Sequence, residues 1–266
     1  MSPSPSPDPA GATGDYFSGL AGVYARFRPG YPATAFDFML SGLAPPITAV
    51  DVGCGTGISS RGLAAAGVTV IAVDPNQDML DEASRHPARP KVAIDYRRGS
   101  ADELPVPDDT ATLVLCAQSY HWFGSRETLE EFHRVLIPNG RLALMWNVRE
   151  TGDSLSAGYE RIMSEAQNQA QSRGRVLCRA RSATPDTPDL FGPAHRERFP
   201  NPQTFDAAGW IGRARSASYF PPEGDPRREE YETALRRLFD THARDGTVTL
   251  RERTEVTMVT ARSRDA

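Results

Sequence analysis

A glycine-rich turn between an apolar strand and a helix constrains this chain more than any other feature. The turn is Asp51-Val52-Gly53-Cys54-Gly55-Thr56-Gly57; ITAVDV (47–52) precedes it, and ISSRGLAAAG (58–67) follows as a predicted helix closed by Gly67. Glycines there let the backbone turn tightly and approach a ligand without a Cβ in the way. We therefore expect a ligand at the carboxyl edge of a sheet, over the N-terminus of the following helix.

Strands and helices continue to alternate after this turn. Asn76 is a candidate cap for a helix through about Ser84, and a second helix is expected from about Ser125 to Leu136, ending before PNG at 138–140. The further strand candidates are 68–74, 92–99, 112–118 and 141–148. Strands that alternate with helices predict an α/β fold with a doubly wound, mostly parallel sheet.

The pattern is looser at both ends of the chain. Helices are predicted at 17–26, 34–43, 154–171, 207–218 and 229–243, an irregular strand within 196–206, and an alternating closing strand at 254–262. We divide the chain into a disordered tail rich in Pro, Ser and Gly (1–14), an N-terminal segment (15–44), a ligand-binding core (45–150), a cap or insertion (151–220), and a final helix with the closing strand (221–266).

Composition narrows the class of protein. The chain has 266 residues, of which 39% are hydrophobic, which suits one α/β domain with an insertion. We find no apolar run long enough to span a membrane and no secretory signal. The net charge is −4 and the arginines are scattered among acids, which argues against nucleic-acid partners. Cys54, Cys116 and Cys178 match no zinc or disulfide spacing, so we expect a cytoplasmic protein without metal. We also expect a monomer or a homodimer.

Asp74 ends the second predicted strand, in VIAVDP. A carboxylate at this point is able to accept hydrogen bonds from both ribose hydroxyls of an adenosine. The sixth position of a dinucleotide fingerprint would be glycine, but this chain has Ile58 there, so that the spacing is G-x-G-x-G. The spacing argues against a bound pyrophosphate.

The glycine turn, the acid at the end of the second strand and two later segments resemble the class I S-adenosylmethionine-dependent methyltransferases. The matching segments are VDVGCGTG (50–57), VDPNQDML (73–80), GSADELPVPDDT (99–110) and HRVLIPNGRLALMWN (133–147), which together cover about 45–150. The nearest groups are ubiquinone/menaquinone-type and trans-aconitate-type small-molecule methyltransferases, and QSYHWF (118–123) is similar to the latter. The resemblance implies a seven-stranded Rossmann-like sheet with an antiparallel last strand, and S-adenosylmethionine as cofactor.

The resemblance also assigns roles on the cofactor side. The glycines flank the methionine half of the cofactor, Asp51 helps to hold its amino group through the loop, and Asp74 takes the ribose. Met79 packs on adenine, Ser100 and Ala101 meet the adenine edge near Asp102, and Gln118 closes strand four beside the sulfonium; the family often has an acid where Ser100 stands. The expected cofactor-binding residues are Asp51, Gly53, Gly55, Gly57, Asp74, Pro75, Met79, Ser100, Ala101, Asp102 and Gln118.

Substrate contacts are expected beyond strand four and in the N-terminal segment, which folds as a lid in similar methyltransferases. His121 is the candidate base for a phenol, an enol or an acidic carbon, since its ordinary pKa lies near neutrality; a structural histidine bonded to a loop carbonyl is the alternative. Arg28 would pair with a carboxylate of the substrate or of the cofactor, or lie solvated. The expected substrate-binding residues are Tyr16, Tyr24, Arg28, His121, Trp122 and Trp146.

We therefore expect methyl transfer to a small molecule. Oxygen or carbon acceptors are favoured because His121 is available as a base. The variable cap suggests a role in secondary metabolism. Two alternatives stay open. One is a protein that keeps the cofactor site for regulation or cofactor-assisted cyclisation. The other is a nicotinamide-dependent oxidoreductase, against which Ile58 and the lack of a Tyr-x-x-x-Lys pair count.

Overall fold

The computed structural model describes residues 21–86, 93–172, 185 and 187–264. The predicted tail (1–14), Tyr16 and Cys178 lie outside these residues. Within them, no helix combines the length and apolar character that crossing a membrane requires.

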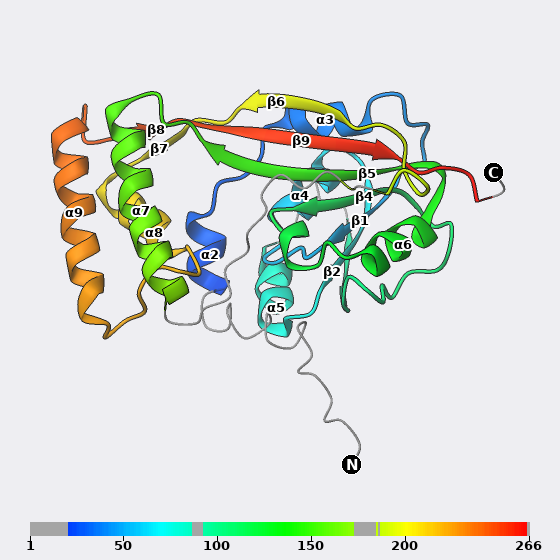
Figure 1. The fold of residues 1–266 in the computed structure, drawn as a ribbon, viewed down its shortest axis with the longest axis horizontal. Helices are drawn as coiled ribbons and strands as arrows, with labels where there is room; N and C mark the ends of the chain where they lie inside the picture. Colours follow the sequence, from blue (N-terminus) through cyan, green and yellow to red (C-terminus); the bar gives the residue numbers. More distant parts are fainter. Residues whose placement is uncertain (1–20, 87–92, 173–184, 186, 265–266) are drawn as a thin grey trace, which may run out of the picture.

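A seven-stranded sheet forms the centre of the molecule (Figure 1). Its order is β3-β2-β1-β4-β5-β9-β6, and β9 runs antiparallel to both of its neighbours, β5 and β6. The strands are β1 (Thr48–Val52), β2 (Thr69–Asp74), β3 (Ile94–Arg98), β4 (Ala111–Ala117), β5 (Leu136–Arg149), β6 (His195–Pro200) and β9 (Glu252–Thr260). The predicted Rossmann-like, mostly parallel sheet with an antiparallel last strand is confirmed.

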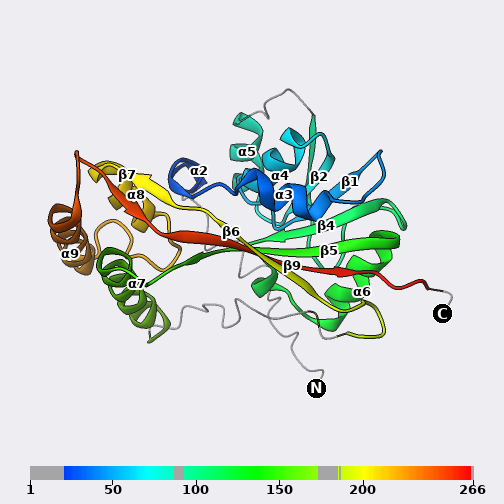
Figure 2. The ribbon, with the colours of Figure 1, turned by 90° about the horizontal axis from the view of Figure 1, so that it is seen from above.

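Helices cover both faces of this sheet, which explains why its inner strands are apolar throughout rather than alternating. Figure 2 shows α3 (Ala33–Leu40), α4 (Ile58–Ala65) and α5 (Gln77–Arg85) on one side and α6 (Arg126–Val135) on the other. Phe36, Leu63 and Leu80 pack on the first face, and Phe132 and Leu129 pack on the second. The sheet therefore lies between two separate hydrophobic layers.

Side-chain caps fix where two helices begin near the carboxyl edge of the sheet. The Asn76 side chain accepts a hydrogen bond from the backbone of Met79 at 3.2 Å, as predicted for the start of α5. Ser125 caps α6 in the same way, at 3.2 Å from the backbone N of Thr128. These caps fix the start of two helices immediately after loops that face the sheet edge.

The predicted break at PNG (138–140) is placed differently in the structure. Strand β5 already begins at Leu136, which pairs with Ala111, and the register shifts before pairing resumes at Leu113 and Arg141. Asn139 takes a positive φ of 63° inside the strand. Pairing with β4 on both sides of the turn makes PNG an irregularity within one strand rather than the boundary between helix and strand.

A cap gathers at one end of the sheet, at the left of Figure 1, where β5 and β9 extend past the other strands. It contains α7 (Ser154–Ser172), β7 (Gln203–Phe205), α8 (Ala207–Arg215), α9 (Pro226–His242) and β8 (Val248–Leu250). Tyr159, Trp210 and Leu235 are its fully buried centre. The final helix α9 packs here against α7 and α8, while β9 closes the sheet.

Helix α2 (Ala21–Phe27) lies between the sheet and the cap (Figures 1 and 2). The Phe27 ring occupies the space above Gly212 of α8, where an added Cβ would lie 2.5 Å from the ring. The N-terminal segment is therefore packed against the cap through a glycine. The boundaries predicted at 44, 150 and 220 stay predictions.

Candidate functional site

A cavity of about 520 Å³ lies at the carboxyl ends of β1, β2 and β4. Its wall includes the glycine turn, the ends of these strands, the loop after β3 and the N-terminal segment. This is the edge at which a ligand was expected.

The glycine turn has a backbone that other residues rarely adopt. Gly53 and Gly55 have φ of 67° and 54°, in the left-handed region. The backbone N of Gly53 donates to the carbonyl of Val73 at 2.8 Å, so the turn is bonded to the end of β2. A Cβ on Gly53 would lie 2.6 Å from Cβ of Ser119, whereas a Cβ on Gly55 meets no atom within 4 Å. Gly55 therefore presents bare backbone to the cavity, whose wall it forms.

Asp74 stands on the cavity wall with only 8% of its surface exposed. Its carboxylate accepts hydrogen bonds from the backbone N of Gly55 at 2.8 Å and of Asn76 at 2.9 Å. Burial raises the pKa of Asp74, and these two N–H donors oppose the rise. Each oxygen keeps a second lone pair, so the carboxylate is able to accept hydroxyl donors from the cavity.

Asp51 lies at the end of β1 and is fully buried, not on the cavity wall. Its Oδ2 accepts hydrogen bonds from Ser59 at 2.7 Å and Ser60 at 2.5 Å. Its Oδ1 is buried and meets no hydrogen-bond donor in the part of the chain that the structure describes. Burial raises the pKa of Asp51 to about 6, and the two serine hydroxyls limit that rise.

Another part of the cavity wall is built by α5 and by the loop after β3. The five residues predicted for the adenine side all line it: Pro75, Met79, Ser100, Ala101 and Asp102. Their contact with adenine stays a prediction. Met79 and Ala101 are 3% and 7% exposed. The carboxylate of Asp102 accepts a hydrogen bond from the Thr128 hydroxyl, which ties it to α6.

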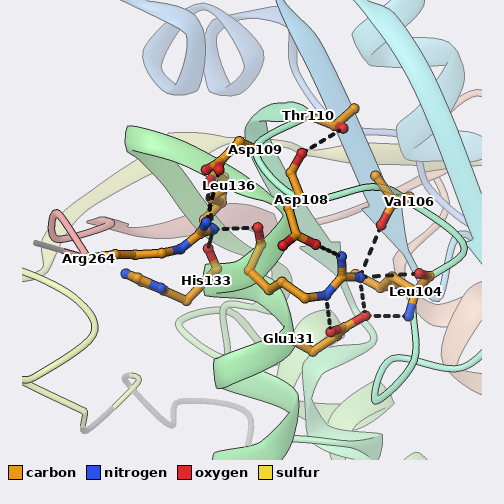
Figure 3. Close-up of polar contacts among 10 residues, drawn as sticks. Leu104, Val106, Asp108, Asp109, Thr110, Glu131, His133, Leu136 and Arg264 are labelled. Carbon is orange, nitrogen blue, oxygen red and sulfur yellow. Dashed lines mark hydrogen bonds and ion pairs between the residues drawn. The ribbon is translucent and has the colours of Figure 1, made fainter.

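Helix α6 holds this loop through a network that Figure 3 shows. Glu131 accepts a hydrogen bond from the backbone N of Leu104 at 2.6 Å. Arg134 pairs with Glu131 and with Asp108, and its Nη2 donates to the carbonyl of Val106 at 3.0 Å. The loop that carries Ser100 to Asp102 is therefore fixed from behind by charged side chains that do not enter the cavity.

Gln118 and His121 stand where strand four ends. Gln118 has a φ of 58°, which is uncommon for a residue with a side chain, and it lines the cavity. His121 and Trp122 also line it, in a short 3-10 helix η2 (Tyr120–Trp122). The His121 ring lies between Trp122 and Trp146, with centroids at 4.9 Å and 5.1 Å and planes tilted by 36°. Trp146 is buried behind His121, not on the cavity wall.

The N-terminal segment closes another side of the cavity with Tyr24, Arg28 and Tyr31. The Arg28 guanidinium lies 4.8 Å from the centre of the Tyr24 ring and donates to the carbonyl of Ser216 at 3.1 Å. Burial lowers the pKa of Arg28 and raises the pKa of Tyr31 well above its usual value. These three residues line the same cavity, and the role of the segment as a lid stays a prediction.

Two asparagines that no sequence pattern indicated anchor this segment. The side-chain amides of Asn147 and Asn201 both donate to the carbonyl of Gly30, at 3.1 Å and 3.0 Å. Asn147 in turn accepts from the Thr254 hydroxyl at 2.6 Å and from Asn201 at 3.1 Å. Asn201 lies between two short strands, and no sequence pattern marks it.

The cavity wall includes one cysteine, and the described residues were also searched for metal ligands. Cys54 lines it but is buried, and burial raises the pKa of its thiol well above the usual value. Among the residues placed by the structure, no group of three or more His, Cys, Asp and Glu side chains is arranged to hold a metal ion.

Comparisons with known proteins concern the core of this chain and its fold. Residues 50–144 match the family model described as a methyltransferase domain. An uncharacterized methyltransferase of Mycobacterium tuberculosis is 40% identical over 134 residues, which cover 50% of this chain and 53% of that protein. The chain thus spans about half the length of the curated relatives it matches.

Two solved structures show the same fold. A structure from Anaeromyxobacter dehalogenans, named as a type II methyltransferase, has a TM-score of 0.62 at 22% identity and covers 89% of this chain and 98% of its own. A Haemonchus contortus N-methyltransferase, in complex with phosphomonomethylethanolamine and S-adenosylhomocysteine, has a TM-score of 0.53 at 13% identity and covers 97% of this chain and 62% of its own.

Proposed function

The chain belongs, through residues 50–144, to the class I S-adenosylmethionine-dependent methyltransferase family, and on this premise we propose that it transfers a methyl group to a small-molecule acceptor. The observation that carries the proposal is one continuous cavity. Its wall holds the Gly53–Gly55 turn and Asp74 together with His121 and Trp122. A cofactor cradle and a candidate acceptor site therefore share one space.

The residues of this cavity fit an adenosyl cofactor. Bare backbone at Gly55 leaves room for a ligand, and the carboxylate of Asp74 has free acceptor positions for ribose hydroxyls. Asp51 lies behind the cavity wall; its buried Oδ1 has no donor among the described side chains and backbone, and the carboxylate would act on the amino group of the cofactor through the glycine turn. Met79, Ala101 and Asp102 would surround the adenine ring. When bound, S-adenosylmethionine supplies an electrophilic methyl group on a sulfonium.

The chain's own residues have mainly to align the acceptor and exclude water from the cavity. The aromatic side chains of Tyr24, Tyr31 and Trp122 form apolar wall on the lid and on the loop after strand four. Aromatic faces also suit a nearby positive charge. The Gly30 carbonyl, held by Asn147 and Asn201, keeps the lid over the cavity.

We assign the base to His121. Its ring is held between two tryptophan rings, so that its orientation is set before an acceptor arrives. The ring lines the cavity, where an acceptor hydroxyl or acidic carbon would present its proton. Oxygen or carbon acceptors are favoured for this reason, because a neutral amine needs no base before methyl transfer.

The test combines binding and turnover. Isothermal titration calorimetry with S-adenosylhomocysteine measures the cofactor site, with NAD as the competing ligand. A library of small phenols, enols and carboxylic acids is then incubated with S-adenosylmethionine, and release of S-adenosylhomocysteine is measured.

We expect S-adenosylhomocysteine to bind, NAD not to bind, and at least one library member to stimulate release. Asp74→Asn should abolish most of that release, whereas Asp78→Asn, an exposed carboxylate on α5, should leave it unchanged. Binding without turnover on any acceptor would favour a regulatory or cyclising role. Binding of NAD alone would make the chain an oxidoreductase.

A further inference from the structure

Among the residues that the structure describes, the wall of the cavity has two carboxylates, those of Asp74 and Asp102. Asp74 is buried and already accepts hydrogen bonds from two backbone N–H groups. Asp102 is exposed and is held differently, by a side chain of α6. The two acids therefore differ in what holds them in place.

Helix α6 contacts the loop after β3 along one of its faces. Thr128, Glu131 and Arg134 are three residues apart in sequence, so they share that face. The Thr128 hydroxyl donates to Asp102, and Glu131 accepts from the backbone N of Leu104 at 2.6 Å. Arg134 donates to backbone carbonyls further along the same loop. Each turn of the helix thus holds a successive part of the loop.

The bond from Thr128 has a different role from the others. The backbone of the loop is also fixed by burial, because Leu104 and Val106 are each only 4% exposed and pack in the core beneath α6. The Thr128 hydroxyl instead binds a side chain that lines the cavity. Its loss would leave the backbone of the loop in place and release one carboxylate.

The chemistry of this bond fixes what the carboxylate offers to the cavity. A carboxylate only accepts hydrogen bonds, so the Thr128 hydroxyl is the donor, and it donates to Oδ1 of Asp102. Thr128 is fully buried, whereas Asp102 without this bond would turn between rotamers in solvent. Oδ2 of Asp102 is therefore held as an acceptor on the wall that Met79 and Ala101 also line.

We propose that Thr128 is a positioning residue that sets the nucleobase selectivity of the cavity. It orients Asp102 so that Oδ2 accepts a hydrogen bond from the exocyclic amine of adenine. A base with a carbonyl at that position would instead bring a second acceptor against the carboxylate. This inference rests on the proposed function, because it concerns the cofactor of the same cavity. Selectivity then depends on a hydroxyl of α6 that does not itself line the cavity.

The test compares S-adenosylhomocysteine with S-inosylhomocysteine, in which a carbonyl replaces the exocyclic amine. Calorimetry measures the dissociation constant of each compound. We expect the unaltered protein to prefer the amine by about tenfold or more, since two acceptors that face each other both stay unpaired. Equal affinities would overturn the proposal, and this comparison needs no variant to fold.

Thr128→Val removes the hydroxyl but keeps the shape of the side chain and the backbone N–H that Ser125 binds. We expect the preference to fall to about threefold or less, mainly through weaker binding of S-adenosylhomocysteine. Thr128→Ser should retain the preference. Thr241→Val, which loses a hydroxyl bonded within α9, is the matched control and should leave it unchanged. A full preference in Thr128→Val would overturn the proposal.

A second pair of variants separates the orientation of Asp102 from a general loss of structure. An amide at this position suits both bases, because it donates or accepts after a flip. Asp102→Asn should therefore have little preference, and adding Thr128→Val to it should change the ratio by less than about twofold. Arg134→Ala, which loosens the loop, should weaken both compounds alike. If Thr128→Val also weakened both alike, its role would be structural and the proposal would be overturned.

Failure of the proposed function gives a different result. If neither compound bound to the unaltered protein, the cofactor assignment would be refuted, and the role of Thr128 with it. If both bound equally well, the cofactor assignment would stand and only the role of Thr128 would be refuted.

Discussion

Replacing Gly53 or Gly55 with alanine should damage the protein in two different ways. Alanine at either position pays about 1–2 kcal/mol for the left-handed backbone. At Gly53 the new Cβ also lies 2.6 Å from Ser119, which adds about 1–3 kcal/mol of overpacking. For a chain of this size the melting temperature of Gly53→Ala should fall by about 5–15 °C. For Gly55→Ala, where the new Cβ meets open space, the fall should be about 2–6 °C.

The affinity for S-adenosylhomocysteine should depend on Gly55, although Gly55→Ala is the variant that lowers the melting temperature less. Gly55→Ala places a methyl group on the cavity wall and should weaken binding by about tenfold or more, because overpacking a fitted ligand costs about 1–3 kcal/mol. Gly67→Ala is the matched control: it has a φ of 83° and open space around it, at the end of α4. Calorimetry and thermal melts on the three variants measure both effects. The reasoning is refuted if Gly55→Ala binds S-adenosylhomocysteine as well as Gly67→Ala does.

Four further substitutions test single residues. Asp74→Asn should weaken S-adenosylhomocysteine binding by about tenfold or more, because it loses acceptors for Gly55 N–H and for ribose; unchanged affinity by calorimetry would contradict the ribose role. Since the pKa of Asp51 is raised to about 6, its ionised form grows as pH rises through that value, and affinity should rise about tenfold between about pH 5 and 7. Asp51→Asn should flatten this profile, and a persistent slope would point to another group. His121→Ala should lower kcat about a hundredfold or more, measured on an acceptor from the library, with cofactor affinity within about twofold; full turnover would remove histidine from the mechanism. Arg134→Ala should cost about 1–2 kcal/mol of cofactor affinity by releasing the loop at Val106, although it never touches the cavity; an unchanged dissociation constant would show that α6 does not position that loop.

The cofactor half of the site was predictable because its signals are local. The glycine turn, the acid at the end of β2 and the Asn76 cap each depend on neighbouring residues, and strand and helix periods place them at one edge of the sheet. A regular parallel sheet needs little more than this alternation to be recognised.

The acceptor side was less predictable because it depends on the direction of single side chains and on distant contacts. Trp146 ends near the expected edge, but successive side chains of a strand point to opposite faces. Trp146 therefore packs on the α6 side behind His121, while its neighbour Asn147 lines the cavity.

The buried ion pair in the cap and the hydrogen bond that holds Gly30 join residues far apart in the chain. Arg213 and Glu252 are separated by 39 positions, and Asn201 and Gly30 by 171. No periodicity connects such pairs, so only the folded structure brings them together.

Crystals soaked with S-adenosylhomocysteine offer the most direct test of this site. We predict electron density in the cavity at residues 53–55, with both ribose hydroxyls within hydrogen-bond distance of the Asp74 carboxylate. Density for the compound elsewhere, or an unchanged cavity in crystals at saturating concentration, would contradict the account.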